Sequence, residues 1–176
     1  MVRGKLVFIA GGVRSGKTSF AEDYLMNEQA KRYVYVASGV AVDEEMKQRI
    51  ERHRQDRAAY QKQWVTIEQP RHIEQLPFSI KKGDAILWDC ITTWLSNELY
   101  VADMERVEKQ LLTTMEKLLM QVKVLVIVSN EVLDEQLSEY DGVLLYQKWI
   151  GRIHQALVAM ADEAYEMDYG LVRQWK

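Results

Sequence analysis

The sequence predicts an α/β fold in which helices flank a mostly parallel central sheet. Short apolar runs recur along the chain, and longer stretches of helical composition lie between them. None of these runs shows the clean polar alternation of a strand with one face in water. Continuous apolar runs are typical of parallel strands covered on both faces. A regular alternation of such strands with helices is typical of α/β proteins.

Length and composition limit the possible organisation of the chain. The 176 residues suffice for one compact domain with a sizeable core, so we expect a single domain over residues 1–176. The composition is 48% hydrophobic and 28% charged, with a formal net charge of -3. Proteins that bind the phosphate backbone of nucleic acids carry a clear basic excess. We therefore expect no nucleic-acid partner.

Cysteine use and hydropathy indicate a cytoplasmic protein. The single cysteine, Cys90, cannot form an internal disulfide and leaves no Cys/His cluster for zinc. Charged residues interrupt every apolar run before it reaches the ~18 residues that a membrane-spanning helix needs. The run Leu6–Ala10 ends in a glycine-rich segment and lacks the cleavage site of a signal peptide. We therefore expect no membrane partner.

The strands are predicted from the apolar runs. In chain order they lie at Lys5–Ala10, Tyr33–Ala37, Ala85–Asp89 and Val122–Ser129. A further strand region is expected to close the chain, within Glu166–Lys176.

The helices are predicted from the stretches between the strands. They lie at Lys17–Gln29, Asp43 to about Gln61, Thr92–Tyr100, Asp103–Gln121 and Leu144–Glu163. Asp43 precedes two glutamates, which favours a helix start because its side chain can cap the helix and the acids face the positive end of the helix dipole. Pro70 and Pro77 bracket a connector that we expect to hold a short helix.

A phosphate-binding motif lies between the first predicted strand and the first predicted helix. It fits the pattern G-x-x-x-x-G-K-[ST] with Gly11, Gly12, Val13, Arg14, Ser15, Gly16, Lys17 and Thr18. Glycines let successive N–H groups point inward, Lys17 supplies charge to the β and γ phosphates, and the Thr18 hydroxyl reaches magnesium. The glycine spacing does not fit the dinucleotide fingerprint G-x-G-x-x-G. The sequence therefore predicts a P-loop that binds a nucleoside triphosphate with Mg2+.

Two acidic residues lie at the ends of later predicted strands. Asp89 closes the strand at 85–89, where a carboxylate can hold magnesium through water. Aspartate is also a favoured helix cap, so a capping role for Asp89 stays open. Glu131 follows the strand at 122–129, at the edge of the sheet where ligands of open α/β folds bind. It is a candidate to polarise a hydroxyl or to contact a γ phosphate, with a structural role as the alternative.

A basic segment lies late in the helix predicted from Asp43. Arg49 lies three residues before Arg52 and four before His53, and His53 lies four before Arg57. At these spacings of three and four, most of the charge shares one helix face. One interpretation is a solvated face near a helix C-terminus. The other is that His53 acts as a nucleophile on a phosphate, with arginines that bind the displaced pyrophosphate.

Other conspicuous side chains are predicted to be structural. Trp88, Trp94 and Trp149 are expected to pack in the core, because aromatic side chains bury large apolar areas. Cys90 is expected to be a small core residue, and His72 a surface residue.

Several separated blocks resemble the bifunctional adenosylcobinamide kinase and adenosylcobinamide-phosphate guanylyltransferase family of cobalamin biosynthesis. The similar blocks are the phosphate loop with Ala21-Glu22, Asp43-Glu44-Glu45-Met46 with Arg49-Ile50 and His53-Arg54, then Arg57, Trp64, Thr66 and Glu68, Asp89 to Leu95 with Asn97, Val128 to Val132, Gly151-Arg152, and Ala161 to Glu163. The likeness is good over residues 4–132. The phosphate loop is a general motif, whereas the blocks at 43–68 and 89–97 are specific.

The resemblance implies a recombinase-like P-loop fold, a homotrimer and two reactions. A kinase step moves the γ phosphate of ATP or GTP to the aminopropanol hydroxyl of adenosylcobinamide. A transferase step carries GMP from GTP to the phosphorylated corrinoid through a guanylylated histidine. Carried over residue by residue, that histidine is His53, and Arg49, Arg52, Arg54 and Glu68 join the phosphate loop and Asp89 in nucleotide binding.

The chain departs from the family pattern after Val132. Residues 133–149 lack the family's glycine-rich, proline-containing loop and its arginine-phenylalanine-arginine stretch, and His154 stands where an asparagine is usual. Two alternatives therefore stay open: a P-loop small-molecule kinase without guanylyltransferase activity, and a nucleotide-dependent switch or binding protein.

Overall fold

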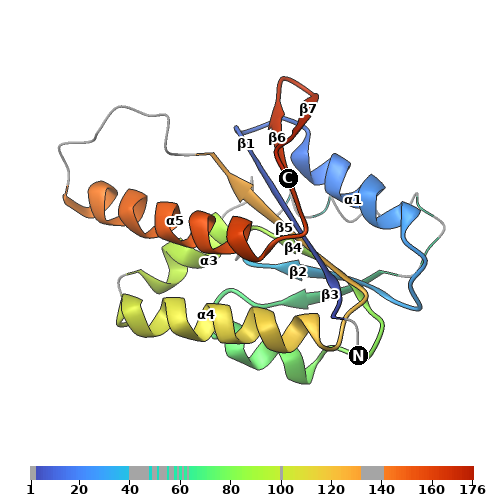
Figure 1. Cartoon of the computed structure of the whole chain (residues 1–176), viewed down its shortest axis with the longest axis horizontal. Helices are drawn as coiled ribbons and strands as arrows, with labels where there is room; N and C mark the ends of the chain where they lie inside the picture. Colours follow the sequence, from blue (N-terminus) through green and yellow to red (C-terminus); the bar gives the residue numbers. More distant parts are fainter. Residues whose placement is uncertain are drawn as a thin grey trace.

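A single seven-stranded sheet forms the centre of the molecule. The computed structural model describes residues 3–39, 48, 51, 55, 58, 60, 62, 64–99, 101–131 and 141–176. The strand order is β3-β2-β4-β5-β1-β6-β7, and the pairs are parallel except β6 with β7 at one edge (Figure 1). The predicted α/β architecture with a mostly parallel sheet is confirmed.

The continuous apolar runs form the strands in the middle of the sheet. The strands are β1 (Lys5–Gly11), β2 (Tyr33–Ala37), β3 (Trp64–Glu68), β4 (Ala85–Asp89), β5 (Val124–Asn130), β6 (Glu163–Asp168) and β7 (Leu171–Gln174). The helices are α1 (Lys17–Asn27), the 3-10 helix η1 (Ile73–Phe78), α3 (Ile91–Glu98), α4 (Met104–Leu119) and α5 (Asp141–Met160). Strands β1, β2, β4 and β5 are almost wholly buried because helices cover both of their faces.

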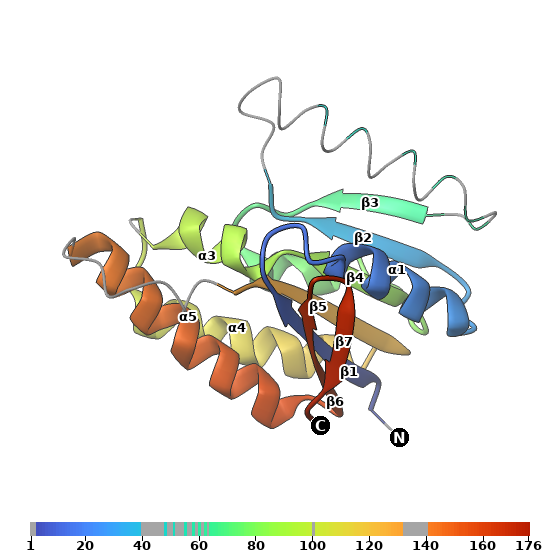
Figure 2. The same ribbon diagram turned by 90° about the horizontal axis from the view of Figure 1, so that it is seen from above.

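Helices cover the two faces of the sheet unequally. Helix α1 lies on one face, whereas α3, α4 and α5 lie on the other (Figures 1 and 2). Successive side chains of a strand point to opposite faces. Accordingly, Val7 and Ile9 of β1 pack in the core beside α1, while Leu6 and Phe8 pack in the larger core on the opposite face.

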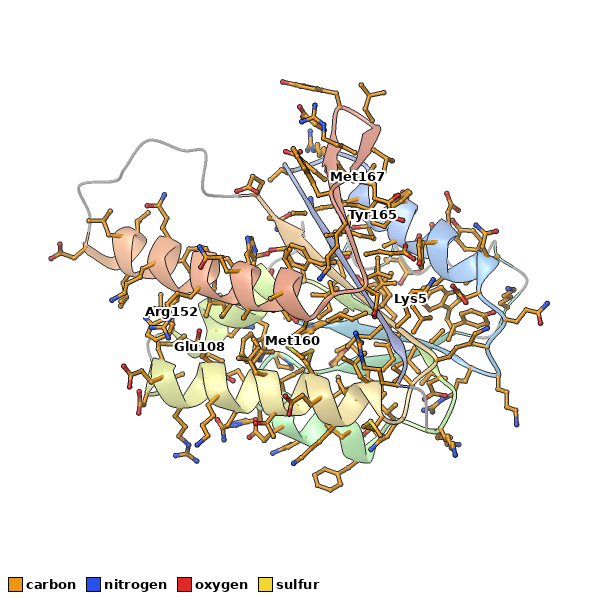
Figure 3. The ribbon with its side chains drawn as sticks, viewed as in Figure 1. Lys5, Glu108, Arg152, Met160, Tyr165 and Met167 are labelled. Carbon is orange, nitrogen blue, oxygen red and sulfur yellow. The ribbon has the colours of Figure 1, made fainter. Side chains whose placement is uncertain are left out.

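Helix α4 shows how the sequence directs one helix face to this larger core. Asp103 caps the helix by accepting a hydrogen bond from a backbone N–H two residues further on, at 3.1 Å. The buried apolar residues recur at spacings of three and four, at Val107, Leu111, Met115 and Leu118. On the exposed side, Arg152 of α5 pairs with Glu108 of α4 (Figure 3).

The start of β6 is fixed by a polar cluster against β1 and α1. Glu163 accepts hydrogen bonds from the hydroxyls of Tyr24 at 2.8 Å and Tyr165 at 2.7 Å, and it pairs with Lys5 at 3.1 Å (Figure 3). Burial alone would raise the pKa of Glu163, but these hydrogen bonds and Lys5 hold the pKa below its usual value. The cluster therefore stabilises the charged carboxylate beside β1.

The last predicted helix needs correction. The sequence predicts Leu144–Glu163, whereas α5 begins at Asp141 and ends at Met160, and Glu163 is the first residue of β6. The polar cluster around Glu163 is made by side chains distant in sequence, so local composition does not reveal it.

The predicted helix from Asp43 to about Gln61 lies largely outside the described residues. Within it, Gln48, Glu51, Gln55 and Ala58 are described and are helical. The expected short helix between Pro70 and Pro77 is η1, which ends just past the second proline. Strand β3 was not predicted.

The expected packing residues are buried. Trp88, Trp94 and Trp149 are core residues, and His72 is exposed, as predicted. Within the parts of the chain that the structure describes, no helix is long and apolar enough to cross a membrane.

Candidate functional site

The phosphate loop joins β1 to α1 at the carboxyl edge of the parallel strands. Gly11 ends β1 and pairs in register with Asn130 of β5 on one side and Met167 of β6 on the other. A side chain at Gly11 would place its Cβ 2.4 Å from the Met167 carbonyl oxygen, so only glycine fits there. Gly16 has a φ of 90°, in the left-handed region that favours glycine. The motif therefore has the backbone shape that its glycines predict.

Lys17 places its charge over this loop. It is the first residue of α1, and its Nζ donates a hydrogen bond to the Gly12 carbonyl oxygen at 2.7 Å. The side chain is 6% exposed. The N-terminus of α1 opens onto the same loop, where backbone N–H groups and the helix dipole favour an anion. The loop, the helix and the lysine together make a site suited to phosphate.

Asp89 lies directly beside the P-loop threonine. The Thr18 hydroxyl donates to Asp89 Oδ2 at 3.2 Å, and the Tyr35 hydroxyl donates to the same oxygen at 3.0 Å. The N-cap of α3 is Cys90, without a side-chain capping bond, so the capping alternative for Asp89 is wrong. A hydroxyl and a carboxylate at this distance are the hard oxygen donors that Mg2+ prefers. The residues present therefore fit a magnesium ion.

Polar groups at the end of β5 complete this edge of the sheet. The Glu131 backbone N–H donates to the Gly11 carbonyl oxygen at 2.8 Å, which ties the residue after β5 to the start of the phosphate loop. The side-chain amide of Asn130 donates to Thr92 Oγ1 at 3.2 Å. These contacts hold β5, α3 and the loop in one arrangement. Glu131 is thus at the predicted edge, and its chemical role stays a prediction.

Cys90 is not arranged as a nucleophile. It is 7% exposed, and its Sγ lies 3.0 Å from Thr92 Oγ1 and 3.1 Å from Thr93 Oγ1. Burial, followed by the negative charge of Asp89, raises the pKa of its thiol. The thiolate is therefore disfavoured, in agreement with the predicted core role.

The C-terminal hairpin contributes residues that the sequence did not indicate. The Gly170 N–H, in the turn between β6 and β7, donates to the Ser15 carbonyl oxygen at 3.2 Å. The Ser15 hydroxyl is buried and has no hydrogen-bond partner within the part of the chain that is described. Tyr35 was also missed as a site residue. The Gly170–Ser15 hydrogen bond and the Tyr35–Asp89 hydrogen bond both depend on strand order, which the sequence left open.

Four basic residues and Glu68 complete the set of residues predicted to act on the nucleotide. His53, Arg49, Arg52 and Arg54 lie outside the described residues. Glu68 ends β3 at the same carboxyl edge as the loop, but β2, β4 and β5 separate β3 from β1. The structure therefore brings Lys17, Thr18 and Asp89 together and leaves Glu68 four strands from the loop.

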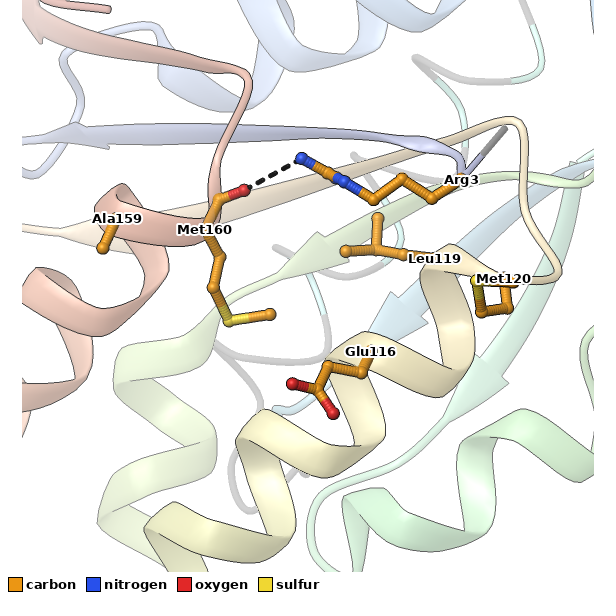
Figure 4. A pocket seen from close by; sticks show the side chains of 6 residues that line it. All are labelled: Arg3, Glu116, Leu119, Met120, Ala159 and Met160. Carbon is orange, nitrogen blue, oxygen red and sulfur yellow. Dashed lines mark hydrogen bonds between the residues drawn. The ribbon is translucent and has the colours of Figure 1, made fainter. Parts of the chain in front are cut away.

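An apolar cavity lies away from this site. It has a volume of about 420 Å³ and is lined by Arg3, Glu116, Leu119, Met120, Ala159 and Met160 (Figure 4). It opens beside the start of β1 and the ends of α4 and α5, at the amino edge of the sheet. There Arg3 forms a salt bridge with Asp162 and donates a hydrogen bond to the Met160 carbonyl oxygen.

Known proteins match the chain along nearly all of its length. The family model of cobinamide kinase / cobinamide phosphate guanyltransferase matches residues 7–174. The bifunctional adenosylcobalamin biosynthesis protein CobU of Salmonella typhimurium is 31% identical over 180 residues, covering 94% of this chain and 97% of that protein.

Two solved structures are similar in fold. An ATPase from the type III secretion system of pathogenic bacteria has a TM-score of 0.59 at 12% identity, covering 98% of this chain and 57% of that chain. The RadB recombinase has a TM-score of 0.54 at 13% identity, covering 94% and 74%. At such identities the likeness concerns the fold alone, and it confirms the predicted recombinase-like P-loop fold.

Proposed function

The chain belongs to the cobinamide kinase / cobinamide phosphate guanyltransferase family, and we infer from this that it is a bifunctional enzyme of adenosylcobalamin biosynthesis. The family match over residues 7–174 is the observation that carries the inference. It covers the phosphate loop, Asp89 and the divergent segment after Val132. The resemblance inferred from the sequence blocks is thereby confirmed.

The kinase reaction uses the phosphate loop. The hydroxyl oxygen of the aminopropanol arm of adenosylcobinamide attacks the γ phosphorus of ATP or GTP, and the bond to the β–γ bridging oxygen breaks, which releases the nucleoside diphosphate. Lys17 and the N–H groups of the loop stabilise the charge on the phosphoryl oxygens. Glu131 accepts the hydroxyl proton. Its backbone bond to Gly11 supports this assignment, because it keeps Glu131 at the loop.

Thr18 and Asp89 would hold the magnesium ion of this reaction. Their 3.2 Å contact brings one hydroxyl and one carboxylate to the same point beside the loop. When bound, Mg2+ would neutralise charge on the transferring phosphates. Tyr35 orients the Asp89 carboxylate by its hydrogen bond at 3.0 Å.

The transferase reaction uses His53. One nitrogen of its neutral imidazole attacks the α phosphorus of GTP, a phosphorus–nitrogen bond forms, and pyrophosphate leaves. The phosphate of adenosylcobinamide phosphate then attacks the same phosphorus, takes GMP and frees the histidine. An imidazole suits this role because its ordinary pKa near ~6.5 leaves it mostly neutral at pH 7. Arg49, Arg52 and Arg54 supply positive charge to the nucleotide.

The enzyme acts as a cytoplasmic homotrimer in this proposal. The family resemblance supports the trimer, and the use of a single, buried cysteine supports a reducing compartment. Light scattering coupled to size exclusion measures the assembly directly.

A product assay tests the proposed function. The chain is incubated with adenosylcobinamide, Mg2+ and either ATP or GTP, and the corrinoids are separated by chromatography. We expect adenosylcobinamide phosphate with at least one nucleotide, and its guanylylated product when GTP is present. Phosphorylation without guanylylation would favour the first alternative, a small-molecule kinase without guanylyltransferase activity. Slow nucleotide hydrolysis without any corrinoid product would instead favour a nucleotide-dependent switch.

A further inference from the structure

The hairpin that closes the chain has an unusual residue in its turn. Two residues, Tyr169 and Gly170, connect β6 to β7, and both have positive φ, at 48° and 79°. A two-residue turn with positive φ at both positions is dominated by Asn, Asp and Gly at its first position. An aromatic residue is strained in the left-handed region. The turn geometry therefore does not account for the tyrosine.

The same turn lies against the phosphate loop. The Gly170 N–H donates to the Ser15 carbonyl oxygen at 3.2 Å. Met167, near the end of β6, is buried and lies within van der Waals reach of the positions that side chains at Gly11 and Gly16 would take. Figure 1 shows the hairpin rising beside the end of β1 and the start of α1, and Figure 3 shows Met167 on it. The position of the turn relative to the loop is thus fixed by a hydrogen bond and by packing.

Tyr169 is almost fully exposed at this place. Its residue surface is 93% accessible, although it follows the buried Met167 by only two residues. A large aromatic ring held in solvent, at a backbone angle that disfavours it, gains nothing from folding. A ligand that covers the ring would give it a function.

The strand order indicates which part of a nucleotide reaches the hairpin. Asp89 and Thr18 would hold the metal and so mark where the β–γ end of the phosphate chain would lie, and Asp89 comes from β4. Strands β4 and β6 lie on opposite sides of β1, from which the loop continues. The nucleoside is attached at the opposite end of the phosphate chain from the γ phosphate. It therefore extends toward β6 and the turn.

We propose that Tyr169 stacks on the purine base of the triphosphate bound in the phosphate loop. The hairpin then forms the base-side wall of the nucleotide site, and the Gly170–Ser15 hydrogen bond sets the position of that wall relative to the loop. Stacking on an aromatic face accepts any purine, because every base has a π face. This inference rests on the proposed nucleotide-binding function and adds the residue that contacts the base.

Substitution with asparagine tests the proposal without disturbing the turn. Tyr169→Asn removes the ring and supplies a residue that the turn prefers, so its thermal stability should equal or exceed that of the parent chain. Calorimetry then gives the affinity for GTP and for inorganic triphosphate, both with Mg2+. We expect GTP to bind on the order of ten-fold more weakly to Tyr169→Asn, with the triphosphate affinity unchanged. Tyr169→Phe keeps the stacking face and should bind GTP like the parent.

Two further variants distinguish failure of the stacking proposal from failure of the P-loop assignment. Leu171→Asn removes another exposed apolar side chain from the same hairpin and should leave both affinities unchanged. Lys17→Ala should lose both ligands, and an unchanged triphosphate affinity in that variant would contradict the P-loop assignment itself. An unchanged GTP affinity in Tyr169→Asn, or an equal loss of GTP and triphosphate, would overturn the stacking role and leave the P-loop assignment intact.

Discussion

Asp89 is positioned by hydroxyl groups from two separate elements, Thr18 at the start of α1 and Tyr35 in β2. A carboxylate that accepts two hydrogen bonds has a fixed orientation, and one of its donors is the residue expected to contact magnesium. At the scale of single residues, the metal side of the site therefore depends on the charge of Asp89 more than on its shape.

Asp89→Asn should weaken the magnesium-dependent part of GTP binding, on the order of ten-fold or more, because it keeps the shape and removes the charge. Binding in the presence of a chelator should change much less. The measurement is GTP affinity with Mg2+ and with EDTA. Tyr35→Phe keeps the carboxylate charge and is the matched control, with a smaller expected loss. An equal loss for Asp89→Asn under both conditions would contradict the metal role.

At the scale of elements, a buried hydrogen bond joins β5 to α5. Ser129 Oγ and His154 Nε2 lie 2.6 Å apart, and the His154 ring contacts Phe8 edge-on at a centroid distance of 5.2 Å. His154 is 9% exposed, and this burial lowers its pKa to about 4. The contact holds the helix against β5, the strand that ends at Asn130, directly before Glu131.

This burial predicts a loss of stability in mild acid. The unfolded chain takes up the His154 proton near pH 6.5, whereas the folded chain takes it up only near pH 4. Stability is therefore complete above about pH 7 and falls as the pH drops from ~6.5 toward ~4. Between pH 7.5 and pH 5 this one group should cost at most ~2 kcal/mol.

Urea unfolding at both pH values measures the effect in the parent chain and in His154→Asn. The variant keeps a polar side chain near Ser129 and lacks the titrating imidazole, so its stability should fall less than that of the parent. The same pH dependence in both proteins would show that His154 does not contribute.

At the scale of the whole molecule, the sequence predicted the parts that depend on local pattern. Strands β1, β2, β4 and β5 were found because each is a continuous apolar run, and Lys17, Thr18 and Asp89 because a motif or a strand end marks them. Strand β3 was missed because it is only partly buried, with exposed residues at Thr66 and Glu68 that break the apolar run.

The rest depends on contacts between distant segments. The start of β6 is set by Lys5 and Tyr24, and Tyr35 meets Asp89 only because β2 neighbours β4. The hairpin turn meets the phosphate loop because β6 pairs with β1. Strand order determines all of these, and local composition does not encode it.

The whole chain is proposed to carry two phosphate chemistries at two separate groups, the phosphate loop and His53. The most direct measurement uses GTP labelled at the α phosphate, with the denatured protein analysed for bound label. We expect label that is acid-labile and alkali-stable, as is typical of a phosphorus–nitrogen bond, and we expect it to be lost in His53→Ala. The same variant should still phosphorylate adenosylcobinamide, because the kinase step does not use the imidazole. Label that persists in His53→Ala, or that never appears in the parent, would contradict the proposed guanylyltransferase role of His53.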